Sequence, residues 1–408
     1  MSRTFLLLLV VLCGCEAPNP SFTIDFSFPP DMAAPLPPVD AGIHDLAYTP
    51  YTVDLTQPVR DIAWPPDMSG LSSGVPTIHC TADNLPDGMS TQSIYTPDGA
   101  TDLVGLCDGW VALADHDNNQ LGFLNAVTHH VGSPIALDGS PGRLALDAEH
   151  DILYATLSPA TKIARIDLRS SEVHYISGFD AAMLAIGNNG QVLGVNRPMI
   201  GPPQLTVFDG TNETILATVD LSMSTDGTLI AFDRGRNLIV TAASGATSAD
   251  PWYSSMNRFA FDPQKLAVTF QETIPDVGIN GEDLLVAPDG LHVIFPCGMG
   301  NDGDYSLTDF HTDDFSKSNG SWPIGAYPAS AAFSPDGKYL AATNISQLEL
   351  WDASSYTKIA QADGCYYTGS PHYRVAYSRG GKVSFLLTSS CYEINSKNVG
   401  LLTYLIGP

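Results

Sequence analysis

A short unit of strand, tight turn and strand recurs through most of this chain. Its clearest copy reads AFSPDGKYLAATNISQLELWD and contains the turn Ser-Pro-Asp-Gly. Pro335 fixes φ at the first corner of this turn, Asp336 caps its own backbone, and Gly337 takes the positive φ. We predict that the segments after the turn, 339–343 and 348–351, are two further strands.

Weaker copies of the unit recur roughly every 40–55 residues, which is the spacing of propeller blades. They lie at 101–115, 143–156, 183–195, 228–242, 284–295 and 374–388, and third strands follow at 162–168 and 204–210. One small antiparallel sheet cannot bury both of its apolar faces alone, whereas neighbours in a closed ring bury them and leave few edges. The sequence therefore predicts an all-β fold with a single β-propeller of about seven four-stranded blades over residues 77–408.

The segment PIGAYPASAAFSPDGKYLAATNISQLELWDASSYTKIA resembles a blade of the YVTN/WD40-like propellers found in exported bacterial proteins. The match comes from the lead-in between Gly325 and Pro328, the SPDGK turn and the strand end Leu350-Trp351-Asp352. The resemblance extends over residues 102–405 and is strongest in the last third. The Gly-His element of eukaryotic WD40 repeats is missing, so the bacterial YVTN type is the closer match.

The first fifteen residues read as an export signal. Arg3 is followed by an apolar stretch at 5–12 that is too short to span a bilayer. The sequence Leu12-Cys13-Gly14-Cys15 resembles a bacterial lipobox, which implies a lipid anchor on Cys15, exposure at the cell envelope and attachment to a membrane. Glu16 after this cysteine favours the outer membrane, and a plain secretory signal is the alternative.

Residues 16–76 are dense in Pro, Asp, Ala and Thr and contain near-repeats such as FPPDM and WPPDM. Proline removes backbone donors and no apolar periodicity is present, so this segment cannot build a packed core. We predict a disordered tether between the anchor and the propeller.

The charge is strongly acidic, with 18 Lys and Arg against 44 Asp and Glu and a formal net charge of −26. This balance repels phosphate backbones and therefore argues against a nucleic-acid partner.

An exported chain meets an oxidising compartment, so we expect its cysteines to pair. The nearest pairs in sequence are Cys80 with Cys107 and Cys365 with Cys391, which leaves Cys297 as a buried thiol. These two predicted disulfides would strengthen the first and last blades, where the ring closes.

Propeller connectivity predicts where ligands bind. The SPDG-type turns join first and second strands and lie on one face, whereas the long irregular segments 196–203, 244–258, 297–306 and 364–373 share the other face. Aromatic anchors there would bind a protein, peptide or glycan. The candidates are Trp252, Tyr253, Tyr305, Tyr327, Tyr366, Tyr367 and Tyr373, with His372 as a lone candidate base.

We found no catalytic motif such as GxSxG or HExxH, and we assign no catalytic residue. We therefore expect a non-catalytic binding scaffold; the alternative is a metal-dependent propeller enzyme of the lactonase or quinoprotein kind. Asp302 and Asp304 share a Gly-containing loop that offers a possible Ca²⁺ site, which lacks a bidentate Glu. The inner strand ends offer Asp147, Asn188, Asp233 and Glu282 as a weak metal cage in the central channel.

Overall fold

The computed structural model describes residues 82–85, 90–96, 99–158, 162–179, 181–196, 203–221, 227–243, 254–278, 281, 283–297, 307–318, 322–325, 328–344, 347–364, 373–392 and 398–407. All of them belong to one compact unit, Arg60–Pro408. The described residues are strands, turns and irregular segments, and none of them forms a helix that could cross a membrane. The predicted Cys15 anchor and the segment 16–76 lie outside the described residues.

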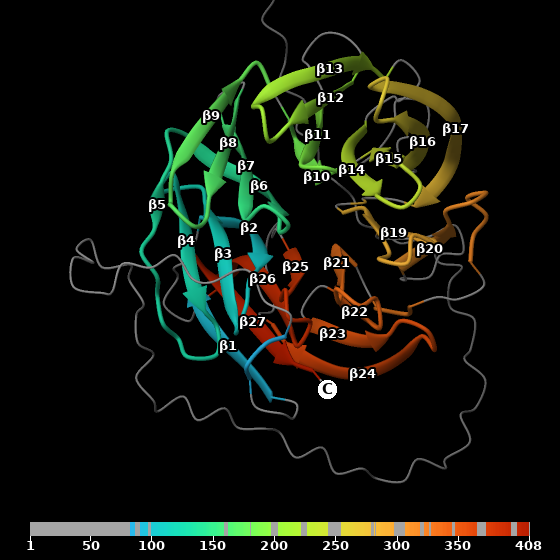
Figure 1. Ribbon diagram of the computed structural model, residues 1–408. Helices are drawn as coiled ribbons and strands as arrows, with labels where there is room; N and C mark the ends of the chain where they lie inside the picture. The colour runs from blue at the N-terminus through green and yellow to red at the C-terminus, as the bar shows by residue number, and fades with distance from the viewer. Residues whose placement is uncertain are drawn as a thin grey trace, which may run out of the picture. The chain divides into compact units, whose positions relative to one another are not determined.

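Seven antiparallel sheets are arranged in a ring, and each is one blade of a β-propeller (Figure 1). Blade 1 is β2 (Ala100–Gly105), β3 (Trp110–Asp115), β4 (Gln120–Asn125) and β5 (Ile135–Ala136). Blade 2 is β6 (Ser140–Asp147), β7 (Ile152–Ser158), β8 (Lys162–Asp167) and β9 (Val173–Ser177). Blade 3 is β10 (Met183–Ile186), β11 (Gln191–Asn196), β12 (Gln204–Asp209) and β13 (Thr214–Asp220).

Blade 4 is β14 (Gly227–Asp233), β15 (Leu238–Ala243), β16 (Ser254–Asp262) and β17 (Ala267–Gly278). Blade 5 is β18 (Leu285–Val286), β19 (His292–Pro296) and β20 (Leu307–His311). Blade 6 is β21 (Ser330–Phe333), β22 (Tyr339–Thr343), β23 (Gln347–Asp352) and β24 (Thr357–Asp363). Blade 7 is β25 (Tyr373–Tyr377), β26 (Val383–Tyr392), β27 (Asn398–Ile406) and, from the start of the ring, β1 (Ser90–Thr96). The predicted all-β propeller with seven blades is confirmed.

The core lies between the blades. The buried apolar side chains fall into seven clusters, and each cluster joins two neighbouring blades. One of them packs Phe123 and Leu121 of blade 1 against Leu153 and Ile166 of blade 2, all fully buried. Burial of apolar area therefore holds each sheet against its neighbours, as the repeat pattern predicts.

Tight turns join the strands on one face of the ring, which we call the turn face. In blade 6, Gly337 has a φ of +72°, and the Ser334 hydroxyl accepts a hydrogen bond from the Tyr339 amide at 3.0 Å. The turn between third and fourth strands begins with an aspartate whose side chain accepts two successive backbone N–H groups. This arrangement recurs at Asp167, Asp209, Asp262 and Asp352. Connections on the opposite loop face fall largely outside the described residues.

The ring closes between its two ends. β1 pairs with β27 over its full length, from Ser90 opposite Ile406 to Thr96 opposite Gly400. Figure 1 shows β1 in blue beside the red strands of blade 7. Sequence analysis did not predict this strand, because β1 precedes the first recognisable repeat and carries no turn signal of its own.

Candidate functional site

A groove on the turn face separates blade 5 from blade 6, and we call it the blade 5–6 groove. Its volume is about 530 Å³. The turn after β18, the turn after β21 and the turn after β23 border it, and aromatic side chains lie among them. The lining residues are Ala287, Pro288, Asp289, His292, Trp322, Phe333, Asp336, Gly337, Lys338, Tyr339, Asp352, Ala353, Ser354 and Tyr356.

The groove lies beside the blade that departs most from the repeat. Blade 5 has three strands in the described part of the chain, and beyond them only isolated bridges join Leu307 to Trp322 and Phe310 to Lys317. Trp322 is 2% exposed and packs between the blades. Its ring lies against that of Tyr356, with centroids 4.6 Å apart. Trp322 and Tyr356 therefore form an aromatic wall of the groove.

Asp309 is a buried carboxylate where the neighbouring blade has a leucine. The strand registers pair His292 with His311 in blade 5 and Tyr339 with Asp352 in blade 6. Asp309 lies two residues before His311, and the fully buried Leu350 lies two residues before Asp352. Asp309 and Leu350 therefore occupy equivalent positions in the two blades. Asp309 is itself only 2% exposed. A polar group thus occupies a core position of the repeat.

Side chains at the groove satisfy this buried carboxylate. His292 donates from Nδ1 to both oxygens of Asp309, at 3.0 and 3.1 Å. The Tyr356 hydroxyl donates to the same carboxylate at 3.3 Å. The hydrogen bond to Asp309 raises the pKa of His292, against an opposing effect of partial burial. Asp309 therefore orients His292 and Tyr356 at the wall of the groove.

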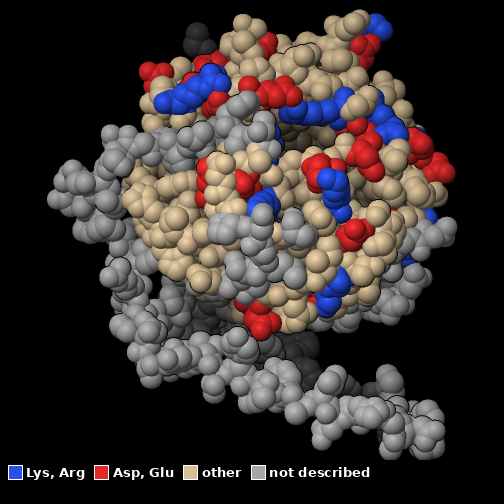
Figure 2. Space-filling model, turned by 60° about the horizontal axis from the view of Figure 1, so that its bottom comes forward, with Lys and Arg blue, Asp and Glu red and all other residues tan. Residues whose placement is uncertain are grey.

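Three further carboxylates border the groove. A hydrogen bond and ion pair with Lys338, followed by a hydrogen bond from Ser334, lower the pKa of Asp336 to about 2. Hydrogen bonds from Ser354 and Ser355 lower the pKa of Asp352. The third, Asp289, accepts a hydrogen bond from the Leu291 amide at 2.8 Å. The rim is thus acidic with a single lysine, whereas acidic and basic side chains mix over the face shown in Figure 2.

A second, smaller cavity of about 170 Å³ lies among the inner strands. Asp102 lines it and accepts hydrogen bonds from the amides of Leu103 and, in the next blade, Leu144. Burial raises the pKa of Asp102, although Arg143 and Arg374 oppose this effect. The hydrogen bonds of Asp102 therefore link the inner strands of two neighbouring blades.

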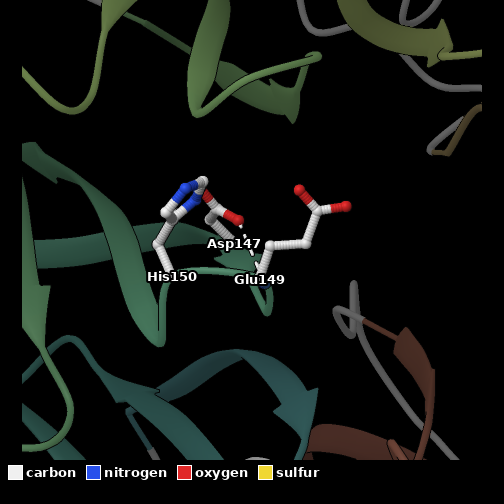
Figure 3. Close-up of side chains that lie close together, drawn as sticks. All are labelled: Asp147, Glu149 and His150. Carbon is white, nitrogen blue, oxygen red and sulfur yellow. Dashed lines mark hydrogen bonds and ion pairs between the residues drawn. The ribbon is translucent and has the colours of Figure 1, made fainter.

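The inner strand ends that we considered as a weak metal cage make contacts within and between turns. Asp147, Glu149 and His150 place one ligand atom each within 4.8 Å of one another. Asp147 and His150 are already hydrogen-bonded at 2.7 Å, while Glu149 points away from the pair (Figure 3). Glu149 instead contacts Arg234 at 3.0 Å. These contacts account for the three side chains without a metal.

Asn188 and Asp233, two further residues of the weak metal cage, make hydrogen bonds in turns. Asn188 donates to the Arg234 carbonyl and to the Asn237 side chain. Asp233 accepts hydrogen bonds from the amides that follow it in its turn. Glu282 lies outside the described residues.

Most residues predicted for the loop face also lie outside the described residues. These are Trp252, Tyr253, Tyr305, Tyr327, Tyr366, Tyr367, His372, Asp302 and Asp304. Tyr373 differs from the prediction of an exposed anchor, because it begins the inner strand β25, is 5% exposed and packs in the core between blades 6 and 7.

Two described cysteines bear on the cysteine predictions. Cys297 is a buried thiol, as expected, and its Sγ lies 3.3 Å from the Thr308 hydroxyl. Cys107 is buried and disulfide-bonded, but Cys80, Cys365 and the side chain of Cys391 are outside the description, so the pairing is not identified. The two predicted disulfides stay predictions.

The blade 5–6 groove was not predicted from the sequence. The available signal was the strand segment Leu307–His311, where Asp309 stands between Thr308 and Phe310. The contact of Asp309 with His292 depends on the strand register, and its contact with Tyr356 depends on the packing of two blades. Neither can be read from the sequence.

Comparisons with known proteins support the fold alone. No protein-family model matches the chain, and no curated protein sequence matches it. A solved structure of hydrazine synthase from Kuenenia stuttgartiensis is similar, with a TM-score of 0.54 and 15% identity over 76% of this chain and 96% of that chain. A functionally unknown protein from Desulfotomaculum acetoxidans has a TM-score of 0.55 and 15% identity over 76% of this chain and 100% of its own. At this identity the likeness is one of architecture.

Proposed function

We propose that this protein is a non-catalytic binding module of the cell envelope that holds its ligand in the blade 5–6 groove. In this proposal Cys15 carries the lipid anchor in the outer membrane and residues 16–76 are the tether. The observation that carries the binding site is Asp309, a buried acid that orients His292 and Tyr356 at the groove wall.

Stability alone does not explain Asp309. Burying a carboxylate costs free energy, and replacing a buried charged arrangement by apolar residues is often neutral or stabilising. Blade 6 shows that Leu350 fills the equivalent position without a buried polar group. An acid retained there, in contact with two groove side chains, is therefore better explained by ligand binding.

Binding fits the groove better than hydroxyl-based catalysis. A nucleophilic hydroxyl needs a base within hydrogen-bonding reach. The Ser354 hydroxyl donates to Asp352 at 2.7 Å, and the Tyr356 hydroxyl donates to Asp309. Hydrogen bonds lower the pKa of Asp352, which makes it a poor base for Ser354, and the carboxylate of Asp309 already accepts a hydrogen bond from His292. The metal-dependent alternative has less support, since Asp147, Glu149 and His150 are already engaged in the contacts of Figure 3 and with Arg234.

The test is to fill the groove. Ser354→Trp places an indole at the groove, and Thr211→Trp places one at the equivalent turn position of blade 3, where the backbone amide likewise donates to an aspartate. Ligands from a mixed library of peptides, oligosaccharides and small metabolites are identified by ligand-observed NMR with the full chain in detergent. We expect S354W to abolish binding of the selected ligand and T211W to retain it.

Two results would move the site elsewhere. Equal binding by wild type and S354W would contradict the groove. Loss of binding in a variant with alanine at Trp252, Tyr366 and Tyr367, with S354W unaffected, would assign the ligand to the loop face predicted from sequence.

A further inference from the structure

We infer that the blade 5–6 groove binds a basic side chain presented on a peptide, with its guanidinium or ammonium group among the rim carboxylates and a peptide carbonyl at the indole of Trp322. This inference rests on the groove being the binding site, as proposed above. It follows from the charge of the rim, from the aromatic wall and from one buried donor.

Two carboxylates at the rim of the groove are available to bind a cation. Lys338 pairs with Asp336 at 2.7 Å and so neutralises one of the three rim carboxylates. Asp289 and Asp352 each use Oδ1 to cap a turn, and within the described residues Oδ2 of each has no hydrogen-bond partner. The hydrogen bonds that lower the pKa of Asp352 keep it ionised well below neutral pH. Among the described residues, no lysine or arginine pairs with Asp289 or Asp352, so two negative charges are available at the groove while His292 is neutral.

A metal ion fits these carboxylates less well than an organic cation. Metal binding by side chains needs several ligand atoms within a few ångströms of one another. In the described part of the chain, Asp147, Glu149 and His150 are the one group of three that meets this spacing, and none of them lines the groove. The spread of the rim acids instead suits a larger cation with several donors, such as a guanidinium group.

The aromatic wall supports the same ligand. Tyr356, Phe333 and Tyr339 line the groove, and Tyr356 is held in place by its contact with Trp322 and its hydrogen bond to Asp309. Aromatic faces attract ammonium and guanidinium groups through their quadrupole, more strongly where water is excluded. A neutral ligand would gain from the aromatic wall but would make weaker hydrogen bonds to the rim carboxylates than a cation does.

Trp322 supplies an independent observation. Its Nε1 is buried and has no hydrogen-bond partner among the described residues. An unsatisfied buried donor costs roughly 1–3 kcal/mol, so native structures rarely leave one without a purpose. Trp322 lines the groove, so an acceptor on the ligand would satisfy this N–H after a small shift of the side chains that bury it. A peptide carries such an acceptor in every backbone carbonyl, close to its side chain.

The experiment compares two peptides of nearly the same shape, in which a charged guanidinium group is replaced by a neutral urea group. Acetyl-Gly-Arg-Gly-amide and its citrulline counterpart are titrated into the full chain in detergent at physiological salt, with binding followed by ligand-observed NMR. We expect the arginine peptide to bind at least about tenfold more tightly than the citrulline peptide.

Matched variants separate the groove from the overall acidity of the protein. Asp352→Asn should weaken the arginine peptide about tenfold. Asp209→Asn removes the same charge from the equivalent turn of blade 3 and should leave binding unchanged. Trp322→Phe, which keeps an aromatic side chain but removes the N–H donor, should weaken both peptides.

Each other outcome overturns the inference. Equal affinity for the two peptides, equal effects of D352N and D209N, or no binding of either peptide would each exclude a basic side chain as the ligand. If a neutral library ligand still binds wild type and is lost in S354W, the proposed function survives while this inference fails. If no ligand of any class is sensitive to S354W, the proposed function fails as well.

Discussion

Two buried aspartates lie at two irregular joints of the ring, and their partners differ. Asp83, at the seam between blades 7 and 1, accepts hydrogen bonds from the Asp108 amide at 2.8 Å, the Ser378 hydroxyl at 2.6 Å and the Lys382 amide at 3.1 Å. Asp309, at the joint between blades 5 and 6, is bonded to the side chains of His292 and Tyr356.

Asp83 has a structural role, whereas Asp309 has a functional one. The partners of Asp83 are two backbone amides and a serine, none of which titrates near neutral pH, and a Cβ at Gly380 would collide with the Asp83 backbone. Asp83 therefore closes a tightly packed seam. The partners of Asp309 line a groove of about 530 Å³, and one of them is a histidine. The first acid stabilises the ring, and the second one shapes a site.

The largest effect is expected at the seam. Asp83→Ala leaves two amides and a hydroxyl without their acceptor at the point where the two ends of the propeller meet, so the free energy of unfolding should fall by roughly 3 kcal/mol. Urea denaturation measures this loss. Asp138→Ala serves as the control, because Asp138 is half-exposed and pairs with Lys162 at the surface. A change of less than about 0.5 kcal/mol in D83A would contradict its structural role.

A smaller, pH-dependent effect is expected at His292. Its folded-state pKa is raised, so its interaction with Asp309 stabilises the fold fully below the unfolded pKa and is lost as pH rises through the folded pKa. The stability difference between wild type and His292→Gln should therefore be larger at pH 5.5 than at pH 8.5. A difference that grows with rising pH would contradict this assignment.

Ligand binding should respond to acid in the opposite direction. Protonated His292 adds a positive charge among Asp309 and His311 of β20, Asp289 of its own turn and Tyr356 of blade 6. The arginine peptide should therefore bind more weakly at pH 5.5 than at pH 8, and this dependence should vanish in His292→Gln. Equal pH dependence in the two proteins would place the titrating group elsewhere.

The fold was largely predictable because its code is local. The turn around Gly337 and its copy at Gly290, which has a φ of +69°, are each encoded by residues adjacent in sequence, so each predicts a hairpin. The seam was not predictable in this way. β1 pairs with β27 and Asp83 contacts Ser378, so both depend on contacts between opposite ends of the chain.

The site was harder to predict than the fold. Sequence analysis placed binding on the loop face because the turn face consists of tight corners. It expected Tyr373 to be exposed there, but this side chain is buried as part of an inner strand. The groove arises on the turn face from a combination that no single motif encodes, namely Asp309 in a core position, His292 opposite it in register and Tyr356 from the next blade.

Asp309→Leu tests the central claim most directly, because it gives blade 5 the residue that blade 6 uses at the equivalent position. Urea denaturation and titration with the arginine peptide are measured on the same preparation. We predict that the free energy of unfolding stays within about 1 kcal/mol of wild type, while peptide affinity falls by at least about tenfold. A variant that loses as much stability as D83A and still binds the peptide as wild type does would show that Asp309 is a structural acid and that the groove is not the site.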